Sequence, residues 1–359
     1  MNDQIYSAIV SYMSRRDGDR ERTCFRLAGL NGALGTTRGA RDENQDRVIA
    51  ISTYHERSRT RIRVFAVADG IGGMLSGSDC ATKAISAFAA SILRGSASPS
   101  ELLPSALAAA NNCIHAEYQG RGGSTIACIL FSGQTDVWIG SVGDSRVYQI
   151  DSEYTPISLT LDDTIEAHIP TRGESLDRGR LIQFIGMGEG MQPNIRTMRS
   201  AELIGHSIMI TTDGAHTLAP DLIGKIIRYS PDALTAATRI LDLSEWLGGH
   251  DNASLALLFP NALSVLQTSG RSDVVSSIWS ANAVGYLQLF QARDAYHAAQ
   301  QTKPLTSEPL VSYLPSSIPH STPQSSLPRT SQETKQVTTA QTGNKEENRG
   351  NGARGKSRG

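Results

Sequence analysis

Short apolar runs that stop at turn residues are the feature that most restricts how this chain can fold. Seven such runs are β-branched, aromatic or alternating, and they are bounded by Gly, Asp and Ser, which is typical of strands. They are Val48–Thr53, Ile62–Ala68, Thr125–Phe131, Val137–Val142, Arg146–Ile150, Ser207–Thr212 and Ser254–Phe259. Because several are separated by tight turns, the pattern predicts antiparallel sheets.

Helical patterns lie between and after these runs. One stripe with a 3.6-residue period carries Ala81, Ala84, Ile85, Phe88 and Ile92, and a second carries Leu103, Leu107, Ala110 and Ile114. Residues Pro231 to Leu247 suggest a further helix. Strands with adjacent one-sided helices predict an α+β fold in which helices cover antiparallel sheets.

Composition restricts the class of protein. A chain of 359 residues with 39% hydrophobic residues can bury a large core. No apolar run approaches the roughly 20 residues that span a bilayer, and residues 1–22 do not resemble a signal peptide. The four cysteines lack CxxC spacing, which indicates reduced thiols and a cytoplasmic location. A net charge of −1 with no basic, aromatic stripe gives no reason to expect nucleic acid.

The composition divides the chain into four parts. Residues 1–22 form a polar N-terminal extension, and residues 23–260 form the globular domain. Within that domain, Thr164 to Arg196 is irregular, and we expect a functional flap there. Residues 261–302 are predicted to be helical, with Asp273 as a cap and a face formed by Val275, Ile278, Trp279, Asn282, Tyr286, Leu289 and Phe290. Residues 303–359 are rich in Pro, Ser, Thr, Gln and Gly, which predicts disorder.

Four aspartates lie in the polar or glycine-rich breaks beside the strand-like runs. They are Asp46, Asp69, Asp213 and Asp251. Strand ends can meet at one edge of a packed sheet, and carboxylates brought together there repel unless a cation lies between them. Oxygen ligands suit a hard cation such as Mg²⁺ or Mn²⁺. The sequence therefore indicates a metal site.

The order of the motifs around these acids is more specific than any one of them. The set is Arg41-Asp42-Glu43-Asn44-Gln45-Asp46, Ala68-Asp69-Gly70-Ile71-Gly72-Gly73, Gly123-Ser124-Thr125, Gly143-Asp144-Ser145-Arg146, Thr212-Asp213-Gly214 and Asp251-Asn252. This set resembles the metal-dependent serine/threonine protein phosphatases of type 2C, the PPM family, in their bacterial form. The resemblance covers residues 23–260.

The resemblance implies a β-sandwich of two antiparallel sheets flanked by helices on both sides, in four layers, with two divalent cations in a cleft at one end. It implies that Asp69 bridges Mn²⁺ or Mg²⁺ ions, with the carbonyl of Gly70 as a ligand to one of them. Asp213 and Asp251 would bind the other, and Asp46 would hold the centre partly through waters. Two such metals lower the pKa of a water and stabilise phosphoryl charge.

Arg41 is the candidate contact to the substrate phosphate, because a guanidinium presents a permanently charged fork. An arginine beside several acids can also simply pair with them. Asp144, Arg146 and the Gly123-Ser124-Thr125 motif are expected to be structural. Gln45 stands where many relatives have Glu, and Ile71 and Met74 stand where some have His. Glu117 is the sole carboxylate in the stretch where relatives bind a third metal, so two metals are expected.

The function predicted is hydrolysis of phosphoserine and phosphothreonine in a phosphoprotein, opposing a bacterial Ser/Thr kinase in signalling. Two alternatives remain. An inactive relative could act as a regulatory binding module, although each predicted metal-binding aspartate is present. A metal-dependent phosphodiesterase or nuclease would share the metals, but the missing basic stripe disfavours it.

Overall fold

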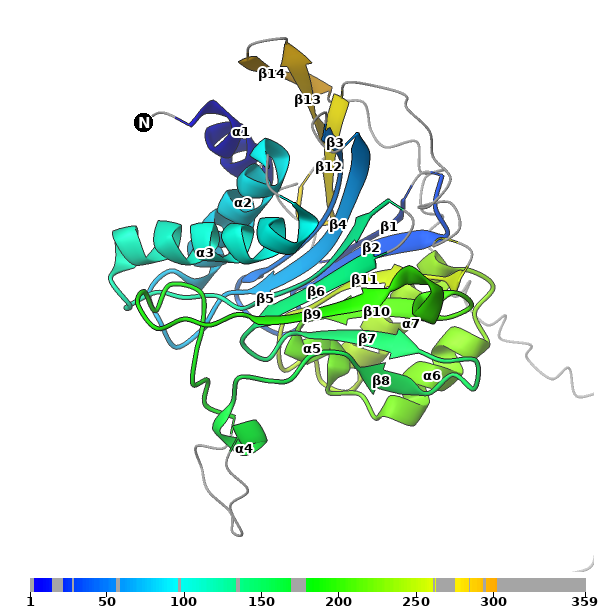
Figure 1. Cartoon of the computed structure of the whole chain (residues 1–359). Coiled ribbons are helices and arrows are strands. Elements are labelled where there is room, and N and C mark those ends of the chain that lie inside the picture. Colours follow the sequence, from blue (N-terminus) through cyan, green and yellow to red (C-terminus); the bar gives the residue numbers. More distant parts are fainter. Residues whose placement is uncertain are drawn as a thin grey trace, which may run out of the picture. The chain divides into compact units, whose positions relative to one another are not determined.

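Two antiparallel sheets pack face to face in this protein, which is described by a computed structural model (Figure 1). The structure describes residues 3–14, 22–27, 29–55, 59–95, 98–133, 136–168, 179–260, 262, 275–283, 285–292 and 295–301. The predicted tail, residues 303–359, lies outside them. No helix in this part of the chain has the length and apolarity needed to cross a membrane.

The first sheet, sheet A, has six strands in the described residues. Their order is β1 (Arg22–Arg26), β2 (Gly32–Thr37), β11 (Ala253–Leu258), β10 (Ser207–Thr211), β7 (Arg146–Ile150) and β8 (Pro156–Ser158). One face of sheet A packs against α5 (Asp213–His216), α6 (Pro220–Arg228) and α7 (Ala233–Trp246). Apolar residues of α7 such as Ile240 and Leu241 are fully buried there.

The second sheet, sheet B, has eight strands in the described residues. Their order is β14 (Ala295–Gln301), β13 (Tyr286–Ala292), β12 (Val275–Ser280), β3 (Asp46–His55), β4 (Thr60–Asp69), β5 (Ile126–Ser132), β6 (Asp136–Val142) and β9 (Asn194–Arg199). Its outer face is covered by α1 (Gln4–Met13), α2 (Gly77–Arg94) and α3 (Pro99–Tyr118). A short helix, α4 (Ile165–His168), and a 3₁₀ turn, η1 (Ser200–Leu203), complete the described elements.

The core between the sheets is built by alternation along the strands. Val48 and Ala50 of β3, and Phe65 and Val67 of β4, face sheet A, whereas Ile49 and Val64 face the helices. The helical stripes predicted around Phe88 and Leu107 are fully buried against sheet B. The four-layer α+β sandwich predicted from the sequence is confirmed.

The segment predicted to be helical after residue 261 is different. Residues 275–301 form strands β12, β13 and β14, so the prediction of a helix there was wrong. β12 pairs antiparallel with β3, which extends sheet B beyond the strand that carries Asp46. The buried residues Ser276, Ile278 and Ser280 alternate along β12, and serine at two of these positions concealed the two-residue period.

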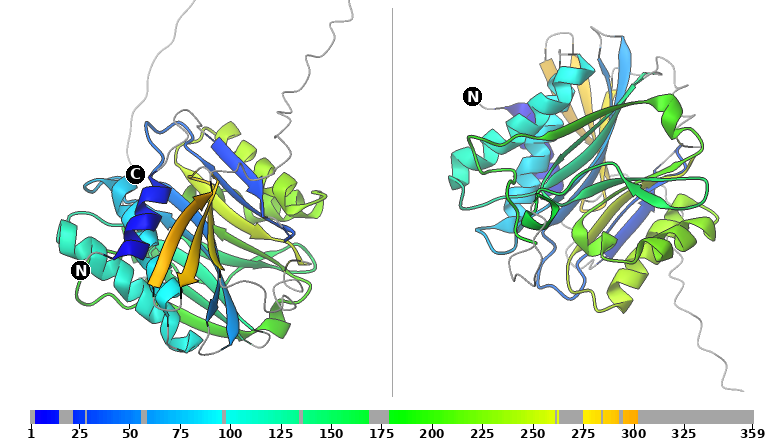
Figure 2. Two further views of the ribbon diagram at one scale, coloured as in Figure 1. Left: turned by 90° about the horizontal axis from the view of Figure 1, so that it is seen from above. Right: turned by 60° about the horizontal axis from the view of Figure 1, so that its bottom comes forward.

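The N-terminal extension is also more than a polar leader to the domain. Residues Gln4–Met13 form α1, whose Ile5, Ile9, Tyr12 and Met13 are buried. Figure 2 shows α1 lying beside α2 and the strands β12–β14. The first and last described elements therefore pack together on the outer side of sheet B.

Candidate metal centre

Asp46 and Asp69 lie opposite each other on neighbouring strands. Asp46 begins β3, Asp69 ends β4, and the two are direct partners in the antiparallel register. Directly opposed residues have Cβ atoms about 5 Å apart, and their side chains leave the sheet on the same face. The strand register therefore brings two carboxyl groups together at one end of sheet B.

Asp213 and Asp251 lie at the corresponding end of sheet A. β10 pairs with β11, and the pairing continues past β10 because Thr212 N donates to Ser254 O (3.0 Å). Asp213 follows Thr212 at the start of α5, and Asp251 precedes β11. Backbone contact fixes these two ends, since a Cβ on Gly214 would lie 2.1 Å from Asn252 O. Any side chain at position 214 would separate the two aspartates.

Thr212 connects the two sheets at this end. Its Oγ1 donates to Asp46 Oδ2 (2.7 Å) and accepts from Ser254 N (2.9 Å). This one hydroxyl acts both as a donor and as an acceptor, and it therefore joins the start of β3 to the paired ends of β10 and β11. Thr212 lies in the Thr212-Asp213-Gly214 motif, but a threonine at the end of a strand is ordinarily a β-propensity residue, so the sequence does not predict this link.

Burial and mutual repulsion raise the pKa values of the clustered acids. Asp46 is fully buried, and burial, opposed by the Thr212 hydrogen bond and reinforced by Asp213, raises its pKa to about 7. Burial and the charges of Asp46 and Asp213 place the pKa of Asp69 well above its usual value. Burial and Asp251 raise the pKa of Asp213, which also shares a hydrogen bond with Asp69. The four predicted acids thus form one interacting group.

Two oxygens of this group are left without partners. Asp46 Oδ1 and Asp213 Oδ1 are buried and accept no hydrogen bond. Buried carboxylate oxygens ordinarily have donors or a cation. Among the described residues, no three His, Cys, Asp or Glu side chains are placed together so that they could hold a metal ion. Repelling carboxylates with orphaned oxygens nevertheless fit divalent cations, whose charge removes the repulsion.

Backbone contacts hold Asp69 and Gly70 in place. Asp69 N donates to Thr125 Oγ1 (3.0 Å), and Asp69 O accepts from Thr125 N (2.8 Å) and Ser124 Oγ (2.8 Å). A Cβ on Gly70 would lie 2.1 Å from Gly77 O, so only glycine allows the strand end to approach the start of α2. The Gly123-Ser124-Thr125 motif therefore supports the backbone of the central aspartate.

Arg41 lies at the edge of the same group. Its Nη2 donates to Asp251 Oδ2 (2.7 Å) and its Nε donates to His250 O (2.8 Å), with the side chain 48% exposed. The Arg41 loop is fixed by Asn252, whose Nδ2 donates to Arg38 O (2.8 Å) and Glu43 O (2.9 Å). Arg41 therefore pairs with an acid, Asp251, and also lies beside the candidate metal ligands.

Gln45, one of the positions that depart from the family pattern, lies at the rim of this group, whereas Glu117 does not. Gln45 N donates to Asn252 Oδ1 (2.8 Å), and its Nε2 donates to Glu43 Oε1 (2.7 Å). Its amide thus faces another acid at the rim of the group. Glu117 is paired with Lys83, on the surface formed by α2 and α3. That ion pair gives Glu117 a role other than metal binding.

Asp144 belongs to the electrostatic group, which sequence analysis did not predict. Burial and the charge of Asp213 raise the pKa of Asp144 to about 6, and Asp144 in turn raises the pKa of Asp69. Its neighbour Arg146 forms a two-point ion pair with Asp162 (2.8 and 2.5 Å). Arg146 is therefore held in a structural ion pair, whereas the Asp144 carboxyl interacts electrostatically with Asp213 and Asp69. The signal in the sequence was Asp144 in a tight turn after a strand.

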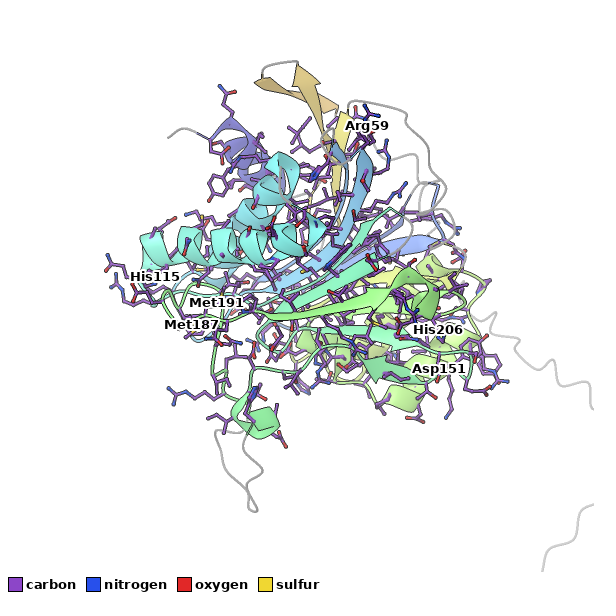
Figure 3. All side chains as sticks on the ribbon, viewed as in Figure 1. Arg59, His115, Asp151, Met187, Met191 and His206 are labelled. Carbon is purple, nitrogen blue, oxygen red and sulfur yellow. The ribbon has the colours of Figure 1, made fainter. Side chains whose placement is uncertain are left out.

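Part of the predicted flap is firmly attached to the domain. Asn111 Oδ1 accepts from Gly186 N (2.8 Å) and Gly188 N (3.2 Å), and Ile185 exchanges two backbone hydrogen bonds with Ser124. Figure 3 shows Met187 and Met191 near His115 at the end of α3. The flap residues 169–178 lie outside the described residues, and Asn194–Arg196 belong to β9. The described parts of the flap, residues 164–168 and 179–196, are therefore two limbs held to the domain, although their sequence is irregular.

A hollow of about 390 Å³ lies between these limbs. Its walls include Asp163, His168, Gln183, Met187, Gln192 and Asn194. Asp163 Oδ2 accepts from Gly143 N (2.9 Å), and Gly143 precedes Asp144. This hydrogen bond thus joins the wall of the hollow directly to the turn that carries Asp144.

Comparisons with known proteins agree with the motifs and the fold. No family model matches the chain. The serine/threonine protein phosphatase PstP of Mycobacterium tuberculosis is 29% identical over 211 residues, covering 54% of this chain and 40% of PstP. The chain thus spans well under half the length of that relative.

Solved structures are similar over the domain. The PstP catalytic domain in complex with two manganese ions has a TM-score of 0.53 and 23% identity, covering 66% of this chain and 98% of that structure. The PPM Ser-Thr phosphatase MsPP from Mycobacterium smegmatis, in complex with cacodylate, has a TM-score of 0.52 and 24% identity, covering 64% and 97%. The chain has the fold of the PPM phosphatases, as its ordered motifs predict.

Proposed function

We propose that this protein hydrolyses phosphoserine and phosphothreonine esters in proteins, with two divalent cations, Mn²⁺ or Mg²⁺, bound at the ends of the two sheets. The observation that carries this proposal is the group formed by Asp46, Asp69, Asp213 and Asp251, in which Asp46 Oδ1 and Asp213 Oδ1 are buried without partners. The similarity to PstP and to its manganese complex supports the same activity.

The roles of the residues follow from their places in the group. Asp69 lies opposite Asp46 in the strand register, and Asp46, Asp213, Asp144 and Asp251 all raise its pKa after burial. Asp69 would therefore help to hold both cations in this proposal. The carbonyl of Gly70, beside it, and Asp46 would hold one cation, and Asp213 and Asp251 would hold the other. When bound, the cations lower the pKa of a water and neutralise charge on the phosphoryl oxygens.

Arg41 binds the substrate phosphate in this proposal. Its guanidinium is half exposed and is held by Asp251 Oδ2 and His250 O. A guanidinium can exchange such acceptors for two phosphate oxygens without changing its charge. Arg41 then orients the phosphoryl group toward the acids, and Asn252 keeps the Arg41 loop in place through its bonds to Arg38 O and Glu43 O.

Turnover of para-nitrophenyl phosphate and of a phosphothreonine peptide tests the proposal. The purified protein is assayed with Mn²⁺, with Mg²⁺ and with a chelator, beside Asp69→Asn. Asp232→Asn is the matched control, because Asp232 caps α7, its partners are Thr235 N and Arg26 rather than the four acids, and an amide also caps a helix. Metal-dependent turnover that Asp69→Asn abolishes and Asp232→Asn retains would support the proposal.

The regulatory binding module is the alternative that this assay separates. Binding of Mn²⁺ without turnover by the wild-type protein would favour that alternative, and it would direct attention to Gln45, whose amide contacts Glu43. A nuclease would instead release nucleotides from DNA or RNA under the same conditions. Neither outcome is expected, since the acids that the phosphatase chemistry needs are present together.

The flap chooses the phosphoprotein in this proposal, because the hollow between its limbs adjoins the Asp144 turn. Removal of residues 169–178, with Ile185 and Asn194 retained, should lower activity on phosphoproteins more than activity on the aryl phosphate. Equal losses would contradict this role. A Ser/Thr kinase encoded elsewhere supplies the phosphoprotein, and both enzymes act in cytoplasmic signalling.

A further inference from the structure

The last described strands of the chain reach the backbone of a predicted metal ligand. β12 pairs with β3 as far as Ser280, which lies opposite Ile49. β12 ends at Ser280, and the partner of Ser280, Ile49, lies three residues after Asp46, where β3 begins. β12 therefore does not reach Asp46. The turn that follows begins at Ala281 and carries Asn282 toward this unfinished edge.

The Asn282 side chain completes the edge. Its Oδ1 accepts from Val48 N (2.9 Å), and its Nδ2 donates to Asp46 O (2.9 Å). A neighbouring strand would satisfy an edge N–H and C=O in the same way. One carboxamide therefore replaces a further residue of β12 at the point where β3 carries its predicted metal ligand.

Two further residues hold Asn282 in this position. Asn282 N donates to Ser280 Oγ (3.1 Å), which orients the residue from inside the turn. The hydroxyl of Tyr12, on α1, accepts from Ser280 N (3.1 Å) and donates to Gly285 O (3.0 Å), so it joins both ends of the turn. Tyr12 and its two bonds are buried, so water does not compete for them.

We propose that Asn282 is a positioning residue of the metal centre, held by Tyr12, and that the N-terminal helix and the C-terminal strands thereby set the affinity for the cations. This inference rests on the proposed function, since it takes Asp46 as a metal ligand. Asp46 has one carboxyl oxygen fixed by Thr212 and the other free of partners. Thr212 thus holds the carboxyl of Asp46 at one oxygen, and Asn282 holds the backbone from which that carboxyl extends.

The test compares Asn282→Ala with Ser276→Ala. Ser276 also joins β12 to β3 through a buried hydrogen bond, from its Oγ to Thr53 Oγ1 (2.7 Å). Thr53 lies about 23 Å along β3 from Asp46, at about 3.3 Å per residue. Both substitutions weaken the same strand pair, but only Asn282→Ala acts beside the metal ligand.

Mn²⁺ affinity is measured directly by calorimetry, with unfolding midpoints recorded in chelator. Loss of a partner that orients a metal ligand commonly weakens binding about 10-fold or more. We expect Asn282→Ala to raise the Kd for Mn²⁺ about 10-fold and Ser276→Ala to change it less than about 2-fold, with similar losses of stability. Turnover of Asn282→Ala should recover at saturating Mn²⁺, because Asn282 touches neither substrate nor the reacting atoms.

Equal Mn²⁺ affinities for the two variants would overturn the inference. If Asn282→Ala does not fold, Tyr12→Phe decides the question, since it removes the hydroxyl that joins Ser280 N and Gly285 O while keeping the buried ring. Tyr12→Phe should then raise the Kd about 3-fold or more, and an unchanged Kd would overturn the inference. A wild-type protein that binds no Mn²⁺ would refute the proposed function itself, and the inference with it.

Discussion

Replacement of Asp46 by asparagine should stabilise the metal-free protein. Asp46 is fully buried, and its pKa is raised from 3.8 to about 7, first by burial and then by Asp213, against the Thr212 hydrogen bond. A rise of about three pKa units corresponds to about 4 kcal/mol once the group is ionised. An asparagine oxygen can still accept from Thr212 Oγ1, so the variant loses the charge and keeps the bond.

The pH dependence has a definite sign. The folded-state pKa of Asp46 lies above that of an unfolded aspartate, so the folded state binds the extra proton between about pH 4 and pH 7. Stability from this group is fully present below about pH 4 and is lost as the pH rises to about 7. In chelator at pH 7.5, we expect Asp46→Asn to be about 2–4 kcal/mol more stable than the wild type.

Urea unfolding in chelator, followed by fluorescence or circular dichroism, measures this difference at pH 5 and pH 7.5. The advantage of Asp46→Asn should be larger at pH 7.5. Mn²⁺ at about 100-fold over its Kd should remove most of this advantage, because it stabilises the wild type by about 2.7 kcal/mol. Asp163→Asn is the control, since Asp163 is equally buried but accepts bonds from Gly143 N and Asn194 Nδ2. It should destabilise the fold.

A metal-free Asp46→Asn that is less stable than the wild type at pH 7.5 would refute this reasoning. So would an advantage that does not change between pH 5 and pH 7.5. Either result would mean that Asp46 is ionised at little cost, as an acid with well-placed donors would be. The unpartnered Asp46 Oδ1 and the neighbouring acids would then not explain the site.

Three further outcomes follow from the same contacts. Thr212→Val should weaken Mn²⁺ binding about 10-fold and cost about 1–3 kcal/mol of stability, because it removes the hydroxyl that joins Asp46 Oδ2 to Ser254 N. Calorimetry measures the Mn²⁺ affinity and urea unfolding measures the stability, and an unchanged Mn²⁺ affinity would contradict this prediction. Arg41→Ala should raise KM for a phosphothreonine peptide about 10-fold or more, as loss of a two-point charged contact does, and a KM equal to that of the wild type would remove Arg41 from the substrate site. A chain shortened after Gln301 should keep the wild-type kcat on para-nitrophenyl phosphate, and a folded but inactive product would show that the tail is needed.

The strands around the site could be predicted because their neighbours in sequence determine them. Residues 62–68 were predicted as a strand, and β4 is Thr60–Asp69; residues 146–150 were predicted, and β7 is Arg146–Ile150. Each run is apolar along its length and stops at Gly, Asp or Ser. The convergence of the four aspartates could likewise be expected, since each ends or precedes such a run.

The contacts between these segments could not be read from the sequence. Thr212 and Asn282 act through single hydrogen bonds to Asp46 across sequence separations of 166 and 236 residues. Thr212 lies in the motif around Asp213 and Asn282 lies on the face predicted to be helical, but neither pattern predicts a contact with Asp46. The sequence pattern predicts a helix in place of the C-terminal strands, because Val275, Ile278 and Trp279 fit a helical stripe as well as a strand. Pairing with β3 decides the matter, and that partner is far away in the chain.

The meeting of α1 with the turn after β12 has a consequence for the order of assembly. Tyr12 and Gly285 are joined across 273 residues, so this contact closes one of the longest loops in the domain. Such contacts form late, because the entropy of closing the loop must be lost before the bond stabilises anything. During synthesis at about 5–20 residues per second, Asn282 and Ser280 are made after all four aspartates, so Tyr12 waits for its partners until the end of the domain has appeared. The nascent chain should therefore acquire its cation affinity last, after both sheets have formed.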